Sequence, residues 1–294
     1  MAKHTKQNPI DELLRARLRI PEGADLRLKS LRLAMRAVDF LSRSLTGQAF
    51  FALREGERVL TALDGRTGPE LVKALLKMNG GTTITSFGLE NVPRHGPVVI
   101  ASTHPVGTFD FIVHAGALLD RRPDLKSVSN REAERFLGAE RIIAVDLDRN
   151  EKVLSARQTR AGMLAHLSEG GALLVFGSGR VADMADGLLV EPPWPTGITR
   201  VSAITETVIV PASTNFRNSR HYYRTRRIAK FLSGGNEKFG RAVASLRYSS
   251  ELMAKLGGRY EVHYGPAQPP GTAPETLKGL AEGLVPGLYV KPKP

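Results

Sequence analysis

The fold of this chain is decided by the stretch ASTHPVGTFD at residues 101–110. It follows the apolar run PVVI at residues 97–100, and apolar, β-branched residues bounded by Gly-Pro and by a Pro/Gly loop predict a strand that is buried on both faces. Such a strand delivers His104 at its carboxyl end, where open α/β sheets collect their ligand-binding and catalytic groups. We therefore expect the functional site to begin at His104.

The loop after this strand carries a second polar residue, Asp110, six positions beyond the histidine. Pro105 and Gly107 turn the chain sharply, so the carboxylate can fold back to the imidazole. Asp110 would hold one ring nitrogen of His104 and fix its tautomer, while the other nitrogen faces a substrate hydroxyl or amine as a general base. The alternative is a loop histidine followed by a helix N-cap, a position that Asp fills well. The spacing is compatible with both interpretations.

Composition restricts the partners and the compartment. The 294 residues suffice for one large core, or for one core and a small appendage. The 42 Lys and Arg against 29 Asp and Glu give a net charge of +13, which favours an anionic partner such as nucleic acid, a phospholipid surface or an acidic carrier. Cysteine is absent, which excludes disulfides, thiolate metal sites and a cysteine nucleophile, and fits a reducing cytoplasm.

Two basic windows are candidates for a membrane surface. Residues 25–45 have apolar residues at helical spacing, and a neighbouring positive stripe gives +4 over residues 26–43. Such a helix either packs on a core with one solvated face or lies on anionic lipid. Residues 217–241 hold eight Lys or Arg and one acidic residue. The membrane-surface residues that we select are Lys29, Arg32, Arg36, Arg43, Arg220, Arg224, Arg226 and Arg227.

Segments with apolar runs alternate between strand and helix patterns along most of the chain. We expect residues 1–80 to form a helical, membrane-surface region, which NGG at residues 79–81 ends, and residues 81–294 to form one α/β domain. We expect α/β architecture: a mostly parallel central sheet flanked by helices, after an N-terminal helical region. Besides the strand at 97–100, the expected strands are 82–87, 125–130, 142–149, 172–176, 208–213 and 259–264, with helices at 131–136 and 155–169 among them.

Several motifs occur in a fixed order around the histidine. They are GLENVP at 88–93, HPVGTFD at 104–110, PPWPTG at 192–197, FRNSR at 216–220 and GP at 265–266. In this order the motifs resemble the lysophospholipid acyltransferase-like, or glycerolipid acyltransferase, superfamily, and in particular its His-Pro-x-Gly-x-x-Asp branch. The resemblance covers roughly residues 82 to 290.

The resemblance implies an O-acyltransferase similar to the 1-acylglycerol-3-phosphate acyltransferases. An acyl group would pass from an acyl carrier protein (ACP) or coenzyme A thioester to a lysolipid hydroxyl, without an acyl-enzyme. His104 would take the proton and Asp110 would orient it. No metal or bound cofactor is expected, because a thioester is already activated and a general base suffices. The substrate-binding residues implied are Thr103, Gly107, Arg149, Ser178, Gly179 and Arg180.

The chain departs from the family pattern at two positions. FGSGR at residues 176–180 stands where the superfamily usually has Phe-Pro-Glu-Gly-x-Arg, so Ser178 replaces a glutamate, and Thr103 stands where asparagine is usual. Losing the carboxylate relaxes the head-group site, so a lyso-aminolipid competes with a lysophospholipid as acceptor. Small residues at a strand end also leave backbone N–H groups free, and these could receive the thioester oxyanion.

Other functional classes remain as alternatives. A non-catalytic module that binds a membrane or an acyl carrier would keep the fold, and the substitutions Thr103 and Ser178 support it. Nucleic-acid binding rests on charge alone, since the basic windows contain no recognised motif, and we do not expect it. Ser178 is not expected to be a hydrolase nucleophile, because Phe176 and Arg180 stand where Gly-x-Ser-x-Gly needs glycines.

The expected location follows from these features. The first nine residues lack the apolar core of a signal peptide, and no run of eighteen apolar residues occurs. We therefore expect a cytoplasmic protein that is peripheral on the inner face of the cell membrane, with an anionic lipid surface, the thioester donor and the lysolipid acceptor as its partners.

Overall fold

A computed structural model describes residues 10–290, apart from 12–13, 16–19, 64, 131–133, 135–137 and 146–151, and gives only the backbone of 152–155. The chain divides into two compact units. The helical unit comprises Met1–Arg66 and Arg220–Lys255, and the sheet unit comprises Thr67–Ser219 and Leu256–Pro294. This division differs from the expected boundary at residues 80 and 81 in two respects. The first segment of the helical unit ends at residue 66, and the chain leaves the sheet unit at residue 220 and returns to it at residue 256.

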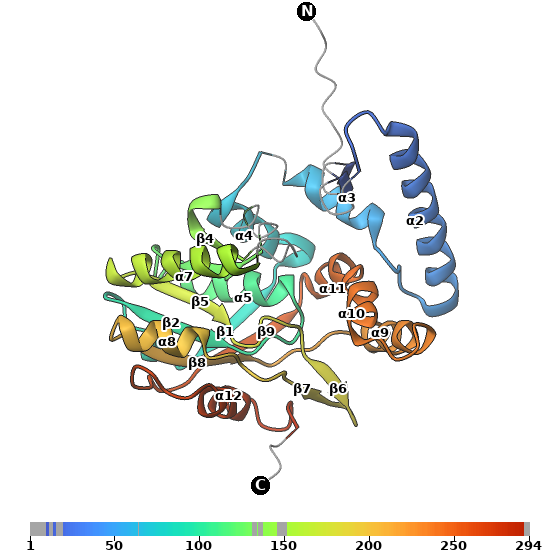
Figure 1. The fold of residues 1–294 in the computed structure, drawn as a ribbon. Coiled ribbons are helices and arrows are strands. Elements are labelled where there is room, and N and C mark those ends of the chain that lie inside the picture. Colours follow the sequence, from blue (N-terminus) through green and yellow to red (C-terminus); the bar gives the residue numbers. More distant parts are fainter. Residues whose placement is uncertain are drawn as a thin grey trace, which may run out of the picture. The chain divides into compact units, whose positions relative to one another are not determined.

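In the described part of the chain, the sheet unit contains a seven-stranded sheet of order β1-β9-β8-β2-β5-β3-β4 (Figure 1). Neighbouring strands are parallel except for β8 and β9, which are antiparallel. A mostly parallel sheet with flanking helices confirms the predicted fold class. The strands are β1 (Thr83–Phe87), β2 (Val98–Ser102), β3 (Lys126–Ser129), β4 (Ile142–Ala144), β5 (Ala172–Phe176), β8 (Val208–Thr214) and β9 (Arg259–Tyr264).

β2 lies in the middle of the sheet, between β5 and β8. All five of its residues are buried, as its apolar sequence predicts for a parallel strand that is covered on both faces. On one face, Val99 and Ala101 of β2 belong to a core cluster with side chains of three helices. These helices are α7 (Lys152–Ser168), α8 (Gly197–Ile204) and α12 (Pro274–Gly283).

Two further helices, α4 (Gly68–Leu76) and α5 (Thr108–Leu118), pack together in the sheet unit. Gly116 of α5 lies so close to its neighbours that an added Cβ would be 2.6 Å from Leu76 Cδ1 and 2.9 Å from Ile84 Cδ1. A glycine at this position therefore lets α5 approach α4 and β1. The first turn of α5 directly follows the loop that carries His104, so the placement of α5 fixes where that loop ends.

A short hairpin that the sequence did not predict lies between β5 and α8. It consists of β6 (Asp183–Ala185) and β7 (Leu188–Val190), which pair antiparallel as a separate two-stranded sheet. Backbone hydrogen bonds join Leu189 N to Leu288 O and Val290 N to Leu189 O, at 2.8 and 2.9 Å. The end of the described chain therefore runs beside the hairpin. Short 3₁₀ turns complete the unit: η1 (Met78–Gly80), η2 (Leu89–Asn91) and η4 (Ala139–Arg141).

The helical unit contains α2 (Asp25–Thr46), α3 (Leu53–Ala62), α9 (Arg220–Leu232), α10 (Glu237–Ser245) and α11 (Tyr248–Lys255). The helix expected over residues 25–45 is confirmed as α2, and its Leu28, Leu31 and Met35 pack in a small core that includes Leu53. None of the described helices is both long enough and apolar enough to cross a membrane. The helix expected at 131–136 and the end of the strand expected at 142–149 fall mostly outside the described residues.

Candidate active site

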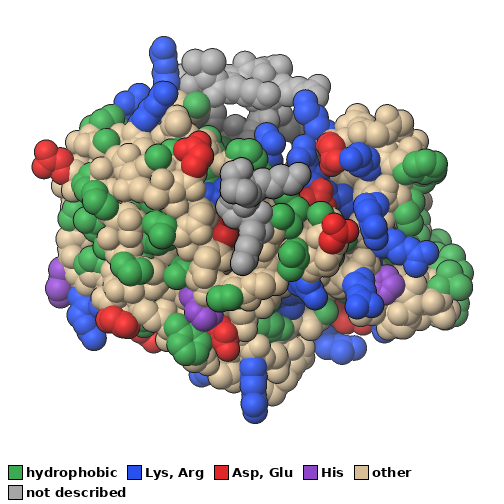
Figure 2. Space-filling model, turned by 90° about the horizontal axis from the view of Figure 1, so that it is seen from below, with side chains coloured by type: hydrophobic (Ala, Val, Ile, Leu, Met, Phe, Trp, Pro, Cys, Tyr) green, Lys and Arg blue, Asp and Glu red, His purple; other side chains and the backbone are tan. Residues whose placement is uncertain are grey.

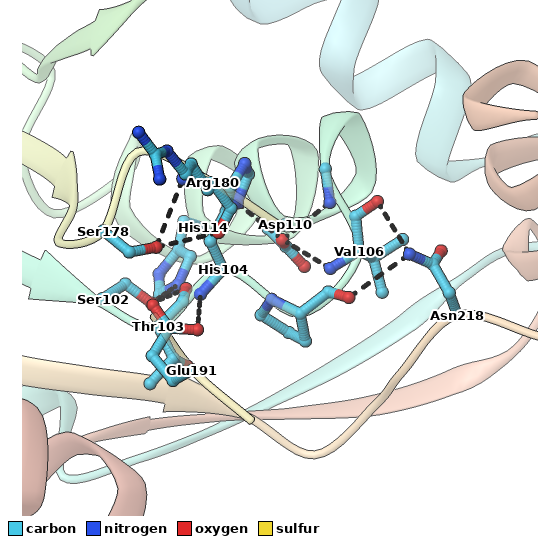
Figure 3. Close-up of polar contacts among 12 residues, drawn as sticks. Ser102, Thr103, His104, Val106, Asp110, His114, Ser178, Arg180, Glu191 and Asn218 are labelled. Carbon is cyan, nitrogen blue, oxygen red and sulfur yellow. Dashed lines mark hydrogen bonds and ion pairs between the residues drawn. The ribbon is translucent and has the colours of Figure 1, made fainter. Parts of the chain in front are cut away.

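His104 and Asp110 meet at the carboxyl end of β2. His104 Nδ1 lies 2.8 Å from Asp110 Oδ2 (Figure 3). Asp110 is fully buried, and the same oxygen accepts the backbone N–H groups of Val106 and Gly107, each at 2.9 Å. The predicted return of the carboxylate to the imidazole is therefore present. Asp110 is the third residue of α5 and Gly107 is its N-cap, so the simple N-cap alternative does not describe this aspartate.

The turn between the two residues is held by backbone geometry and by one amide. Gly107 has φ 110° and ψ −123°, a conformation that L side chains rarely adopt, so glycine is required here. We predicted Gly107 as a substrate contact, and its observed role is to shape the turn and bind Asp110. Asn218 Nδ2 donates to the carbonyls of Pro105 and Val106, each at 3.3 Å. Asn218 belongs to the FRNSR motif at residues 216–220, which was a sequence signal, but its contact with this turn was not predicted.

The imidazole of His104 has one engaged side and one open side. Its ring stacks on Phe176 of β5 with the centroids 4.4 Å apart. Nδ1 is buried beside Asp110, and the 16 % of the side chain that remains exposed lies on its other atoms. The backbone carbonyl of His104 accepts a hydrogen bond from Ala182 N at 2.9 Å. Asp110 therefore orients the ring, and Nε2 is the nitrogen that can serve a substrate.

The turn after β5 carries three of the predicted substrate-binding residues. Gly177 N donates to Ser102 O and Gly179 N to Phe176 O, each at 2.9 Å, and Arg180 N donates to Ser178 Oγ at 3.2 Å. Among the backbone N–H groups of residues 177–180, that of Ser178 donates to no acceptor within the described residues. Of the free backbone N–H groups expected at this strand end, the turn offers one, that of Ser178. Gly179 and Arg180 are exposed, and Figure 3 shows Ser178 and Arg180 beside His104.

A glutamate that the sequence did not indicate lies in this site. Glu191, which follows β7, is 3 % exposed, and its Oε2 accepts the backbone N–H of His104 at 3.4 Å. Burial raises the pKa of Glu191 to about 7, against the opposing effects of the Ser178 hydroxyl, the charge of His104 and the Trp194 indole. The turn itself has no carboxylate at Ser178, as the sequence indicates, but a carboxyl group from another part of the chain lies beside His104. The carboxyl group comes from another element, thirteen residues further along the chain.

Thr103 was predicted to contact the substrate, and this prediction is corrected. The residue is fully buried, and its Oγ1 accepts a hydrogen bond from the Tyr289 hydroxyl at 2.8 Å. Ser213 Oγ lies 3.0 Å from the same oxygen. The Thr103 side chain therefore joins β2 to β8 and to the end of the described chain, and is not available to a substrate.

A second histidine, His114 of α5, lies in the core near His104. It is fully buried, with Nε2 2.8 Å from Ser102 Oγ and Nδ1 3.3 Å from the Tyr264 hydroxyl. Burial lowers the pKa of His114 to about 4, and the neighbouring charge of Asp110 opposes the shift only in part. His114 is therefore neutral near pH 7, and both of its ring nitrogens contact hydroxyl groups inside the core.

The predicted membrane-surface residues divide into two groups. On α2, Arg32 pairs with Asp11 and Glu57 at 2.9 Å each, Arg36 with Glu57 at 3.3 Å, and Arg43 with Glu55 at 2.5 Å. The Arg32 side chain is only 18 % exposed, so this part of the positive stripe is neutralised within the unit. Arg226 is also corrected, since it is buried and lies 3.8 Å from Glu237. The remaining predicted residues, Lys29, Arg220, Arg224 and Arg227, are exposed.

Arg149 lies outside the described residues, so its predicted place near the acceptor is not assigned. The described site thus consists of a buried aspartate, a partly open histidine, one free backbone N–H, an exposed arginine and a buried glutamate. Fold and site together define an α/β protein with a His–Asp pair at the carboxyl end of a mostly parallel sheet.

No protein-family model and no curated protein sequence matches the chain. Among solved structures, the chain is similar to the crystal structure of the 1-acyl-sn-glycerophosphate (LPA) acyltransferase PlsC from Thermotoga maritima. The two are 12 % identical with a TM-score of 0.46, over 87 % of this chain and 95 % of that chain.

Proposed function

We propose that the protein is an O-acyltransferase that moves a fatty acyl group from an acyl-ACP or acyl-CoA thioester to the hydroxyl of a lysolipid. The observation that carries the proposal is the 2.8 Å approach of His104 Nδ1 to the buried Asp110 carboxylate, with the rest of the imidazole partly exposed. A histidine held in this way has its tautomer fixed and presents Nε2 as a general base. The order of the motifs along the chain supports acyl transfer over other reactions that use such a base.

The reaction proceeds by direct attack. His104 Nε2 accepts the proton of the acceptor hydroxyl as its oxygen attacks the thioester carbonyl carbon, and the new C–O bond forms while the carbonyl oxygen becomes an oxyanion. Ser178 N is the donor of the nearby turn that can receive this oxyanion. When the intermediate collapses, the C–S bond breaks, and the thiolate leaves with the proton that the imidazolium returns. The products are the acylated lipid and the free thiol.

The acceptor is a lysophospholipid or a lyso-aminolipid. Arg180 is the exposed cation of the described site, and it suits a phosphate or carboxylate head group. Arg149 is proposed for the same purpose on the sequence pattern alone. Neither residue separates the two acceptor classes, because both classes carry an anionic group.

We further propose that the protein acts at an anionic membrane on the cytoplasmic side. The helical unit exposes large apolar side chains next to basic ones, and Figure 2 shows both kinds gathered over it. On α9, Phe231 is 82 % exposed and borders surface hollows that Arg224, Arg227 and Lys230 also line. Apolar side chains that enter the interface beside cations are typical of peripheral membrane proteins.

The direct test is an acyl-transfer assay. Purified protein is given radiolabelled acyl-ACP or acyl-CoA, with lysophosphatidic acid or lyso-ornithine lipid as acceptor, and labelled lipid is separated and counted. Transfer that depends on His104 supports the proposal. Binding of the donor or of vesicles without any transfer would contradict it and favour a non-catalytic binding module that retains the fold.

A further inference from the structure

Glu191 is a buried acid that the proposed reaction does not yet use. Both carboxylate oxygens have partners: Trp194 Nε1 donates to Oε1 at 3.1 Å, and His104 N donates to Oε2 at 3.4 Å. The residue is 3 % exposed. Burying a carboxyl group with two N–H donors is costly, and proteins commonly retain such a group where it serves a site.

The groups that face Glu191 come from four segments. Ser178 stands on the turn after β5, His104 on the loop after β2, Trp194 on the loop before α8, and Tyr289 near the end of the described chain. Ser178 and Trp194 are polar side chains without charge, and Trp194 donates to Glu191. Burial keeps the Tyr289 hydroxyl protonated by raising its pKa, and the charge of Glu191 acts in the same direction. His104 is thus the facing group that becomes cationic during the proposed reaction.

No Lys or Arg among the described residues forms an ion pair with Glu191, whereas Glu282, a buried glutamate on α12, is paired with Lys278 at 2.7 Å. The charge of an ionised Glu191 is therefore balanced by dipoles in the resting protein. In a buried, low-dielectric environment an unpaired anion interacts strongly with a cation that forms nearby. The imidazolium of His104 is such a cation.

We propose that Glu191 is a positioning residue for His104: its carboxylate holds the His104 backbone amide in place and stabilises the imidazolium that forms as the acceptor proton is taken. The inference rests on the proposed function, in which His104 is the base. In this arrangement Asp110 acts on the ring at Nδ1, and Glu191 acts through the backbone and through its charge. The hairpin formed by β6 and β7 has the role of bringing this carboxylate back to the site.

The first experiment measures acyl transfer by Glu191→Gln, Glu191→Asp and Glu282→Gln. We expect Glu191→Gln to lower kcat by roughly 10-fold to 100-fold with KM changed less than about twofold, because the lost charge acts on the transition state. Glu191→Asp keeps the charge and should recover part of the loss. Glu282→Gln removes a buried carboxylate elsewhere in the same unit, and its kcat should stay near that of the wild type. Equal kcat in Glu191→Gln and the wild type would overturn the inference.

The second experiment needs no substrate. The ¹³C signal of the Glu191 side-chain carboxyl is titrated in the wild type and in His104→Gln, and the signal is assigned from its absence in Glu191→Gln. Because the charge of His104 lowers the pKa of Glu191, the titration midpoint of Glu191 should rise when that charge is removed. An unchanged midpoint would overturn the inference even in an active enzyme. Loss of the proposed function would appear separately, as a wild type that transfers no acyl group.

Discussion

The Tyr289 hydroxyl donates a hydrogen bond to Thr103 Oγ1 at 2.8 Å, although the two residues are 186 positions apart. Thr103 directly precedes His104, so the end of the described chain is tied to the base of the proposed active site. Backbone hydrogen bonds between Leu189 of β7 and the residues on either side of Tyr289 hold the same segment.

Tyr289→Phe tests this connection. The ring still fills its buried position, but one hydrogen bond to Thr103 is lost, so the free energy of unfolding should fall by about 1 kcal/mol. Since Ser213 still contacts Thr103, we expect kcat to fall only a few-fold. Urea unfolding and steady-state acyl transfer measure both effects. A variant that is as stable and as active as the wild type would show that this hydrogen bond contributes nothing to either.

His104→Ala should lower kcat by roughly 10²-fold to 10⁴-fold while the fold is retained, because the general base is removed. Asp110→Asn should cost a comparable factor, since the imidazole loses the anion that orients it. The control is His95→Ala, which changes an exposed histidine of the same unit. Circular dichroism checks the fold of each variant. Near-normal transfer by folded His104→Ala would refute the mechanism.

Because His114 is buried as a neutral imidazole, we expect the free energy of unfolding to fall in mild acid. Burial lowers its pKa from 6.5 to about 4, so below pH 6.5 the unfolded chain gains a proton that the folded protein does not yet bind. The contribution of this residue to the free energy of unfolding should therefore decrease by about 3 kcal/mol between pH 6.5 and 4. Urea unfolding of the wild type and of His114→Gln over this range measures the difference. Parallel pH profiles for the two proteins would contradict the prediction.

For Glu191 we expect the opposite dependence of the free energy of unfolding on pH. Its pKa is raised from 4.5 to about 7, so the folded protein keeps a proton that the unfolded chain has already lost. Stability from this residue is present below pH 4.5 and is lost as the pH rises through 7. Glu191→Gln removes the titration, so its stability relative to the wild type should increase by about 3 kcal/mol from pH 4.5 to 8. A stability difference that does not change with pH would show that Glu191 titrates normally.

Membrane binding should depend on both charge and apolar contact. We expect Phe231→Ala, and separately Arg224→Ala with Arg227→Ala, to weaken binding to vesicles that contain anionic lipid, and only the arginine variant to reduce its salt dependence. Each exposed cation near such a surface contributes on the order of 1 kcal/mol. Arg94→Ala with Arg200→Ala is the matched control, since both arginines are exposed in the sheet unit. Cosedimentation with anionic and neutral vesicles measures binding. Equal binding to both types would refute an anionic surface as the partner.

The parts of the site that the sequence predicted are local. β2 is a continuous apolar run, and His104 and Asp110 are separated by one short turn, so strand pattern and spacing were enough. Glu191 and Tyr289 reach the site through tertiary topology. The hairpin that precedes Glu191 has two strands of three residues each, too short for a clear alternating pattern. The pairing of Tyr289 with Thr103 has no local signal.

The basic stripe of α2 is a second case in which the sequence pattern predicted the local structure but not the tertiary contacts. Helical spacing predicted that the cations share one side of the helix, and it also predicted the helix itself. The side of the helix that faces the rest of the unit depends on acidic residues elsewhere in the chain. Three arginines of the stripe form ion pairs with Asp11, Glu55 and Glu57. Large apolar residues such as Leu33 and Phe40 are exposed instead. Amphipathic spacing does not decide the orientation of a helix that has apolar residues on more than one side.

The contact between Gly177 and Trp194 restricts which residues this turn can hold. A Cβ at position 177 would lie 2.1 Å from the indole ring, so the proline of the Phe-Pro-Glu-Gly pattern cannot be accommodated there while Trp194 keeps its place. Moving the indole would take away one of the two hydrogen bonds that hold Glu191. Gly177, Trp194 and Glu191 therefore depend on one another and would have to be changed together. Grafting Pro-Glu onto residues 177 and 178 of this chain should give a defective hybrid unless positions 191 and 194 are changed with them.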